Sequence, residues 1–281
     1  MKNDLRAMMA SLTVPVIAAP MTGVSGPELV VAACRAGVIG SFPAHNASSH
    51  EELGQWLAQI NEGRKRATDS GLTPAPVAVN LVMRAKERLA GDLEQVVKHG
   101  VPLVIASVGS PAGIIPAMHA AGVSVLADVA SMRHVDKCIE AGADGLVLLT
   151  AGAGGNTGWV NPFAFVRAVR DIYDGPIVLA GGVSDGVALR AAITLGCDLA
   201  FMGTAFIATT ESRAGLEYKQ ALIGANLDFV ESRLGPEGLT ACFLRDSHFS
   251  AGHSVSGVRR LASVEELVAR LRHEWDSAGA R

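Results

Sequence analysis

Short runs of apolar residues recur along the chain, separated by longer stretches in which apolar and polar residues alternate at helical spacing. The runs are rich in Val, Ile, Leu and Ala, and few polar residues interrupt them. Runs of this kind predict strands that are buried on both faces. We expect eight strands, at residues 14–21, 38–42, 77–83, 103–108, 123–129, 145–150, 176–180 and 199–202.

Helix signals fill the segments between these strands. Ser49 and Glu52 fit the S-x-x-E capping box, Pro27 starts an earlier helix, and Gly37 stops it. Residues 63–76 form a polar stretch punctuated by Gly and Pro. Parallel strands joined by helices give either an open doubly wound sheet or a closed barrel, and eight units without a reversal favour a (β/α)8 TIM barrel, an α/β fold. The predicted helices are 27–36, 49–62, 86–99, 114–121, 131–141, 163–173, 184–195 and 263–275.

The alternation of strands and helices stops at about residue 210. We therefore expect a barrel over residues 12–210 and a lid-like helical or irregular excursion over residues 211–260. In the last part of the chain, residues 261–281, the sequence pattern predicts a capped amphipathic helix that packs on the barrel.

Composition narrows the classes of function. The net charge is −3 and the only basic run is 64–66, so we expect no nucleic-acid partner. No apolar run is long enough for a membrane span, and no secretion signal begins the chain, which predicts a cytoplasmic protein. The four cysteines are far apart and form no CxxC pair, so neither a metal site nor a disulfide framework is predicted.

Three glycine-bearing elements follow the last three predicted strands. They are the loop 151–158, the pair Gly181 and Gly182, and the pair Gly203 and Thr204. In a TIM barrel, ligands bind where the strands end, and glycines after the last two strands commonly hold a phosphate. A glycine loop alone also suits a tight connector, but three neighbouring elements favour a phosphate-bearing ligand.

The remaining strand ends offer amides, hydroxyls and one carboxylate, Asp128. No lysine lies at a strand end, which disfavours a Schiff-base aldolase. No cluster of His, Asp and Glu there resembles a metal hydrolase, so no metal ligand is predicted. An apolar, amide-rich rim suits a large flat cofactor that is held by its phosphate and supplies redox chemistry itself.

Several motifs in order along residues 12–210 resemble the nitronate monooxygenase (2-nitropropane dioxygenase) family, which is similar to FMN-dependent enoyl-ACP reductase II. The motifs are VPVIAAPM, VAVNLVM, AGAGGNTG with NPFAF, IVLAGGVSD and AFMGTAF. Residues 211–281 match only loosely. The resemblance implies a flavoprotein barrel with FMN as cofactor and oxidation of alkyl nitronates with O2 as activity.

The resemblance also implies which residues hold FMN. The Met21 backbone and Asn80 would contact the isoalloxazine or ribityl groups, and Asp128 would bond a ribityl hydroxyl or a neighbouring strand end. The phosphate would lie on main-chain groups after the last two strands. The full cofactor set is Met21, Asn80, Asp128, Thr150, Gly154, Gly155, Gly181, Gly182, Gly203 and Thr204.

The chain departs from the family in the loop after the sixth strand. The family's loop usually reads AGGH-x-G, with a histidine near the flavin as base or hydrogen-bond donor, whereas this chain has Asn156 at that position. An amide does not titrate, so Asn156 cannot remove a substrate proton, although it can donate a hydrogen bond. We expect activity on preformed nitronates to survive this change. His45, just after the second strand, is the other candidate catalytic residue.

Three alternatives stay open beside this assignment. One is an NAD(P)H-dependent flavin reductase of quinones or enoyl substrates. Another is a non-flavin barrel that binds a sugar phosphate or nucleotide for lyase or isomerase work. The third is a binding protein that kept the FMN pocket and lost catalysis. The sequence predicts a small-molecule substrate and leaves the oligomeric state open.

Overall fold

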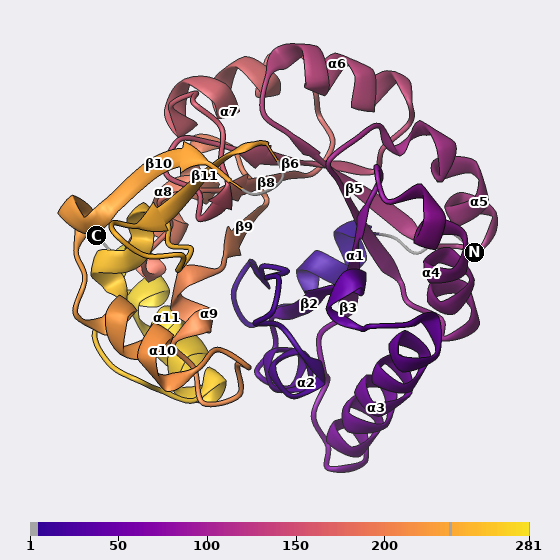
Figure 1. Cartoon of the computed structure of the whole chain (residues 1–281), viewed down its shortest axis with the longest axis horizontal. Coiled ribbons are helices and arrows are strands. Elements are labelled where there is room, and N and C mark those ends of the chain that lie inside the picture. The colour runs from indigo at the N-terminus through magenta and orange to yellow at the C-terminus, as the bar shows by residue number, and fades with distance from the viewer. Residues whose placement is uncertain (1–4, 236–237, 281) are drawn as a thin grey trace.

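The computed structural model describes residues 5–235 and 238–280, and its centre is a closed barrel of eight parallel strands (Figure 1). Each strand pairs with the next along the barrel, and β9 pairs with β1 to close it. The predicted TIM barrel is confirmed. The barrel strands are β1 (Val16–Ala18), β2 (Ile39–Pro43), β3 (Val77–Val82), β4 (Leu103–Ser107), β5 (Ser124–Val129), β6 (Gly145–Leu149), β8 (Ile177–Ala180) and β9 (Leu199–Met202).

Helices surround this barrel, as the outer ring of ribbons in Figure 1 shows. Their apolar faces pack on the outward side chains of the strands, which gives the fold two layers around a filled core. The helices of the ring are α2 (Pro27–Arg35), α3 (His50–Asp69), α4 (Lys86–Lys98), α5 (Ile115–Ala120), α6 (Met132–Glu140), α7 (Pro162–Arg170) and α8 (Gly186–Leu195). Within the described residues, no helix combines the length and the apolar character that a membrane crossing needs.

One helix is longer than the sequence pattern predicts. The polar stretch that begins at Gly63 is helical as far as Asp69, so α3 does not end at residue 62. The physical reason is a close helix contact, because a Cβ at Gly63 would lie 2.7 Å from Cγ2 of Val31 on α2. Gly63 therefore serves close packing between helices and does not end α3.

Inside the barrel, alternate residues of each strand form successive layers. Ala78, Ile105 and Leu126 belong to the buried inner cluster, and α1 (Leu5–Ala10), a helix that the sequence pattern does not predict, packs Leu5 against it. Because side chains alternate along a strand, the residues two positions further on also point inward. These residues are Asn80, Ser107 and Asp128 on three consecutive strands.

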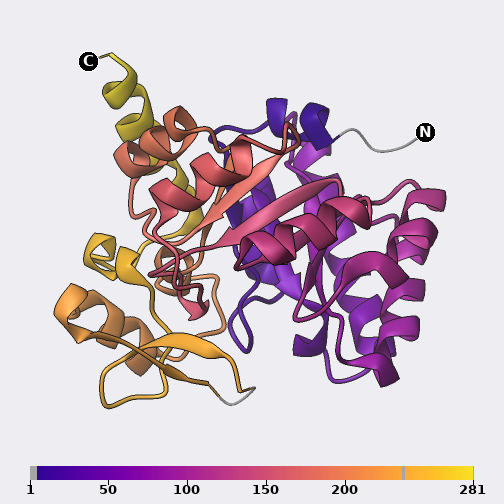
Figure 2. The same cartoon turned by 90° about the horizontal axis from the view of Figure 1, so that it is seen from above.

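The excursion contains more regular structure than predicted. Its hairpin of β10 (Val230–Leu234) and β11 (Thr240–Leu244) pairs with β7 (Gly155–Asn156), in the loop after β6. Figure 2 shows this hairpin and α10 (Leu216–Ile223) at one end of the barrel, opposite α1. Strand pairing thus ties the excursion to the glycine-rich loop. The excursion also holds the 3-10 turns η3 (Leu227–Phe229) and η4 (His253–Gly257), and the short helix α9 (Thr204–Ile207) precedes it.

The last helix, α11 (Val264–Gly279), is the predicted capped helix, and its cap is a capping box of Ser263 and Glu266. It packs closely on α8, where the Glu274 carboxylate accepts a hydrogen bond from the Gly186 N–H at 2.9 Å. The guanidinium of Arg190 lies 3.8 Å from the ring centroid of Trp275. The C-terminal helix therefore lies against the outside of the barrel.

Candidate functional site

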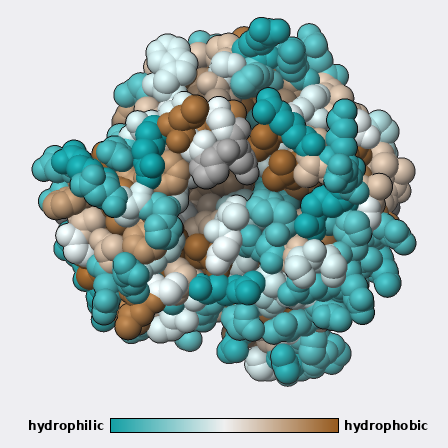
Figure 3. Space-filling model, viewed as in Figure 1, coloured by the Kyte–Doolittle hydropathy of each residue, from teal (hydrophilic) through white to brown (hydrophobic). Residues whose placement is uncertain are grey.

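A cavity of about 450 Å³ lies at the carboxyl ends of the barrel strands, within the central hollow of the face in Figure 3. The barrel supplies its floor and the excursion supplies part of its wall. The cavity brings together predicted residues that are far apart in the sequence. They are Met21, His45, Asn80, Asp128, Gly154, Gly155, Asn156, Gly181, Gly182, Gly203 and Thr204.

Thr150 is the exception among the predicted cofactor residues. Its side chain is fully buried, and its hydroxyl donates to the carbonyl of Ala180 at 2.9 Å. A Cβ at Gly181 would lie 2.5 Å from the same hydroxyl oxygen. Thr150 thus lies beneath the turn after β8 and is not among the residues that line the cavity.

The turn after β8 exposes main chain to the cavity. Gly181 and Gly182 have φ values of +128° and +75°, which favour glycine, and a Cβ at Gly182 would meet no heavy atom within 4 Å. Gly203 caps α9 nearby, and the first N–H groups of a helix have no partner inside it. We call Gly181, Gly182, Gly203 and Thr204 the anion cradle.

The first N–H groups of α8, the other helix that begins near this turn, already donate hydrogen bonds to side chains of the protein. At α8, the Ala188 N–H donates to the Asp185 carboxylate, and Glu274 accepts from Gly186. The Thr204 hydroxyl accepts from the Gly252 N–H at 3.0 Å and keeps its own hydrogen for donation. No Lys or Arg is among the described residues that line the cavity. An anion bound in the cradle would therefore be held by main-chain amides and a hydroxyl.

Asn80 presents an acceptor to the cavity. Its amide nitrogen donates to the carbonyl of Ile105 at 3.0 Å and to the hydroxyl of Ser107 at 2.9 Å. Both amide hydrogens are thus engaged, which leaves the carbonyl oxygen for a ligand. Asn80 therefore suits a ligand that offers an N–H or O–H group.

Met21 lines the cavity, and its backbone is hydrogen-bonded within the protein. Its N–H donates to the Ser25 hydroxyl at 3.1 Å, and its carbonyl accepts from the Asn46 amide at 2.9 Å. The backbone that was expected to contact the cofactor is thus used within the loop after β1. Asn46, whose role the sequence pattern did not reveal, also donates to Ser25 and accepts from Gly23, and it fixes this loop.

Asp128 is the carboxylate of the cavity floor. Its Oδ1 atom is buried and has no hydrogen-bond partner among the described residues. Burial raises the pKa of this carboxyl to about 7, because the charged form loses solvation. The group therefore changes charge near neutral pH.

Asn156 lies on β7, where the excursion holds it in place. It pairs with Ala241 of β11, and the N–H of the preceding Gly155 donates to the Ser250 hydroxyl at 2.7 Å. The Tyr218 hydroxyl of α10 donates to the Ser250 carbonyl at 2.5 Å. Tyr218, Phe243 and Ser250 also line the cavity. The sequence did not identify these three, because no short-range pattern places residues 218–250 over the barrel.

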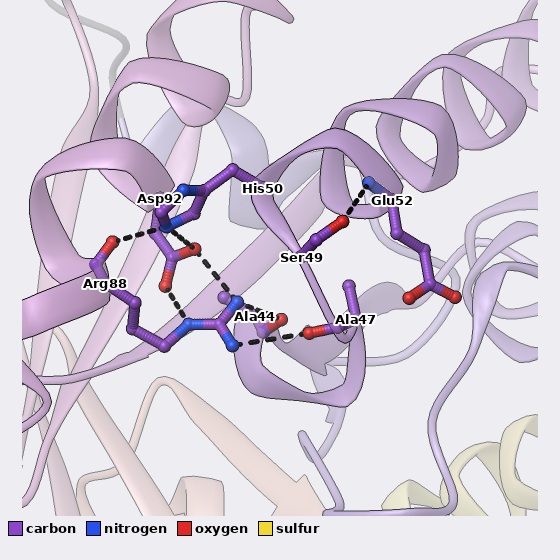
Figure 4. Close-up of polar contacts among 7 residues, drawn as sticks. All are labelled: Ala44, Ala47, Ser49, His50, Glu52, Arg88 and Asp92. Atoms are coloured by element: carbon purple, nitrogen blue, oxygen red, sulfur yellow. Dashed lines mark hydrogen bonds and ion pairs between the residues drawn. The ribbon is translucent and has the colours of Figure 1, made fainter.

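His45 lies in the turn η1 (Ala44–Asn46), with its Nε2 atom 2.9 Å from the Thr22 hydroxyl. Arg88 of α4 does not line the cavity, and its guanidinium holds this turn, as Figure 4 shows. Its guanidinium donates to the carbonyls of Ala44 at 3.1 Å and Ala47 at 3.3 Å, and to the buried Asp92 carboxylate at 2.8 Å. Arg88 therefore positions the segment that carries His45.

Replacing Arg88 with alanine should lower the free energy of unfolding by about 3 kcal/mol, because the buried Asp92 carboxylate loses its main partner. The change would be measured by urea denaturation. Lys65→Ala is the matched control, since the Lys65–Asp69 pair has the same helical spacing but lies in solvent. Equal losses in the two variants would contradict the role given to Arg88.

Among the described residues, no group of three or more His, Cys, Asp or Glu side chains is arranged to hold a metal ion. The chemistry that the cavity offers is therefore hydrogen bonding, anion binding and one titrating carboxyl. Such a cavity orients a bound organic cofactor and its substrate.

A barrel with this cavity at its strand ends is the architecture of a TIM-barrel enzyme. The family model described as nitronate monooxygenase matches residues 70–239. The nitronate monooxygenase of Pseudomonas aeruginosa is 30% identical over 269 residues, which cover 79% of this chain and 74% of that protein. The chain belongs to the nitronate monooxygenase family and is a flavin-dependent oxidoreductase, which confirms the resemblance seen in its motifs.

Two further similarities are to a relative with a different name and to a solved structure. A Mycobacterium tuberculosis protein named (3aS,4S,5R,7aS)-5-hydroxy-7a-methyl-1-oxo-octahydro-1H-indene-4-carboxyl-CoA dehydrogenase is 28% identical over 262 residues, covering 92% of this chain and 70% of that protein. The structure of FabK from Thermotoga maritima superposes with a TM-score of 0.87 at 20% identity, covering 100% of this chain and 98% of that chain. The second similarity supports the fold alone.

Proposed function

We propose that this chain is an FMN-dependent oxidoreductase that oxidises alkyl nitronates with O2. The observation that carries this proposal is a single cavity that joins the anion cradle to a wall where Asn156 replaces a titrating base. The excursion, residues 211–260, forms the substrate side of this cavity. The four cysteines are buried and unpaired, which fits a reducing cytoplasmic setting.

The residues present fit FMN. The anion cradle offers main-chain N–H groups to a terminal phosphate, and a side chain at Gly182 would project into open space. Asn80 offers its carbonyl oxygen, and the buried Oδ1 of Asp128 lacks the partner that a bound ligand would supply. A phosphate at the cradle and polar groups along the floor match the two ends of this cofactor.

The bound flavin would supply the electron transfer from substrate to oxygen. The residues of the chain would bind and orient the substrate beside it. Asn156 would donate a hydrogen bond to an oxygen of the anionic nitronate. A nitronate is already deprotonated, so its oxidation needs no general base. We therefore expect turnover of preformed nitronates to exceed turnover of the neutral nitroalkanes.

The test begins with the visible spectrum of the purified protein and the mass of any cofactor released by heat. Oxygen uptake is then followed with a preformed alkyl nitronate and with the matching neutral nitroalkane. FMN release and faster oxidation of the nitronate would support the proposal. A colourless folded protein that does not bind added FMN would contradict it and favour a phosphate-binding lyase or isomerase.

A second candidate is an NAD(P)H-dependent reductase of quinones or enoyl substrates, or the reverse dehydrogenation. It is favoured by the relative named as a carboxyl-CoA dehydrogenase, which covers 92% of this chain. The cavity wall also offers apolar contacts from Val82, Ile207 and Phe243 to a larger substrate. Rapid anaerobic bleaching of the bound flavin by NADH or NADPH would support this candidate, and unchanged absorbance would contradict it.

A further inference from the structure

The floor of the cavity carries three inward polar side chains, on the adjacent strands β3, β4 and β5. Asn80 and Ser107 are hydrogen-bonded to each other at 2.9 Å. Asp128 is next along the floor, and its buried Oδ1 atom has no partner among the described residues. A buried polar atom without a partner is costly, so this oxygen points to a contact that a ligand makes.

The surroundings of Asp128 favour the neutral acid. On the adjacent strands, Val147 is its partner on β6, and Ser107 ends β4. On α6, the titratable group that interacts with the charge of Asp128 is the Cys138 thiol. Burial and Asp128 together raise the pKa of this thiol to about 11. On α5, His119 is paired with Asp144, which lies at the start of β6 and thus at the other end of the barrel.

The other charged groups near Asp128 do not compensate it. The other charged residues of α6 are solvent-exposed: Arg133, His134, Asp136, Lys137 and Glu140. The cavity itself adds His45 and Tyr218. Burial is the cause of the raised pKa of Asp128, with no cation acting against it. An ionised Asp128 would thus be a poorly solvated charge without a counter-ion, with its Oδ1 atom buried.

We propose that Asp128 binds FMN as the neutral carboxylic acid and donates a hydrogen bond to it, so that cofactor binding takes up one proton. This inference rests on the proposed function for the identity of the cofactor. A ligand that fills the cavity covers Asp128 and removes the water that remains there, which penalises the carboxylate further. The phosphate of FMN brings additional negative charge into the same cavity, and ring and ribityl oxygens accept hydrogen bonds.

The expected pH dependence follows from linkage. Below a pKa of about 7 the free protein already carries the proton on Asp128, so the affinity for FMN does not change with pH. Above it, binding must take up a proton, so affinity falls by up to tenfold per pH unit. Between pH 7 and pH 9 the dissociation constant should rise about 50-fold. A phosphate monoester, whose second pKa is about 6, keeps its charge over this range.

The experiment measures the dissociation constant of FMN for the apoprotein by quenching of flavin fluorescence from pH 7 to pH 9. Three proteins are compared: the natural chain, Asp128→Asn, and Asp69→Asn as a control at an exposed site on α3. We expect the rise in the natural chain and in Asp69→Asn, and a flat profile in Asp128→Asn, which is neutral at every pH. A flat profile in the natural chain, or a rise that persists in Asp128→Asn, would overturn the inference.

Calorimetry of the natural chain provides a measurement that needs no variant. FMN is titrated at pH 8 in two buffers of different ionisation enthalpy, and the difference in heat gives the number of protons taken up. Uptake close to one proton supports the inference, and no uptake overturns it. Failure of FMN to bind at any pH would instead contradict the proposed function, and this inference with it.

Discussion

Replacing Gly182 with valine should weaken FMN binding at least about 100-fold, equivalent to about 2.7 kcal/mol. At this position a Cβ would point into the open cavity, so the branched side chain would occupy space next to the anion cradle. The positive φ of +75° adds backbone strain for any residue except glycine. Fluorescence titration of the apoprotein with FMN measures the loss.

A matched control separates lost space from backbone strain. Gly71, after α3, has a φ of +88°, and a Cβ there would also meet no atom within 4 Å, but it does not line the cavity. Gly71→Val should lose stability to a similar extent and keep its affinity for FMN. If Gly182→Val bound FMN as tightly as Gly71→Val, the phosphate would not lie at this turn.

The barrel was predictable because each of its strands is a local signal. Parallel strands buried on both faces appear as continuous apolar runs, and a helix lies between each barrel strand and the next along the chain. The end of α3 was not predictable, because Gly63 looks like a stop signal until its contact with Val31 is known. Nor was α1, whose place under the barrel depends on long-range contacts.

The candidate site was predictable to the extent that strand ends meet at one end of a barrel. That rule brings Asn80, Asp128 and the anion cradle together, but it does not say which groups are already satisfied. Thr150 and Met21 both come shortly after a barrel strand. The Thr150 hydroxyl and the Met21 backbone are nevertheless hydrogen-bonded to other groups of the protein. Such assignments depend on hydrogen-bond partners in space, which spacing along the sequence does not reveal.

The contacts of the excursion were likewise not predictable from spacing along the sequence. The pairing of β7 with β11 joins residues about 85 positions apart, Asn156 and Ala241. Gly155 is free to adopt its φ of +66° there, and Ser250 accepts the hydrogen bond of its N–H. The loop that bears the family's histidine is thus held in this chain by a sheet, so a new side chain at residue 156 would enter a fixed frame.

Replacing Asn156 with histidine should raise the rate of neutral nitroalkane oxidation about 100-fold or more, within the range of about 10² to 10⁴ for a positioned general base. Oxidation of preformed nitronates should change little, because that reaction needs no proton removal. The rate on the neutral substrate should rise with pH as the imidazole loses its proton, near the ordinary pKa of histidine of about 6.5. Oxygen uptake with both substrate forms from pH 5.5 to pH 8.5 measures this.

The control is Asn156→Gln, which keeps an amide of greater length and does not titrate. It should oxidise neutral nitroalkanes no faster than the natural chain and show no new pH dependence. The pairing of β7 with β11 makes the comparison direct, because both substitutions project from the same strand position in the cavity wall. If histidine and glutamine behaved alike, residue 156 would not contact the substrate, and the loss of the family's histidine would have no bearing on which substrates this enzyme accepts.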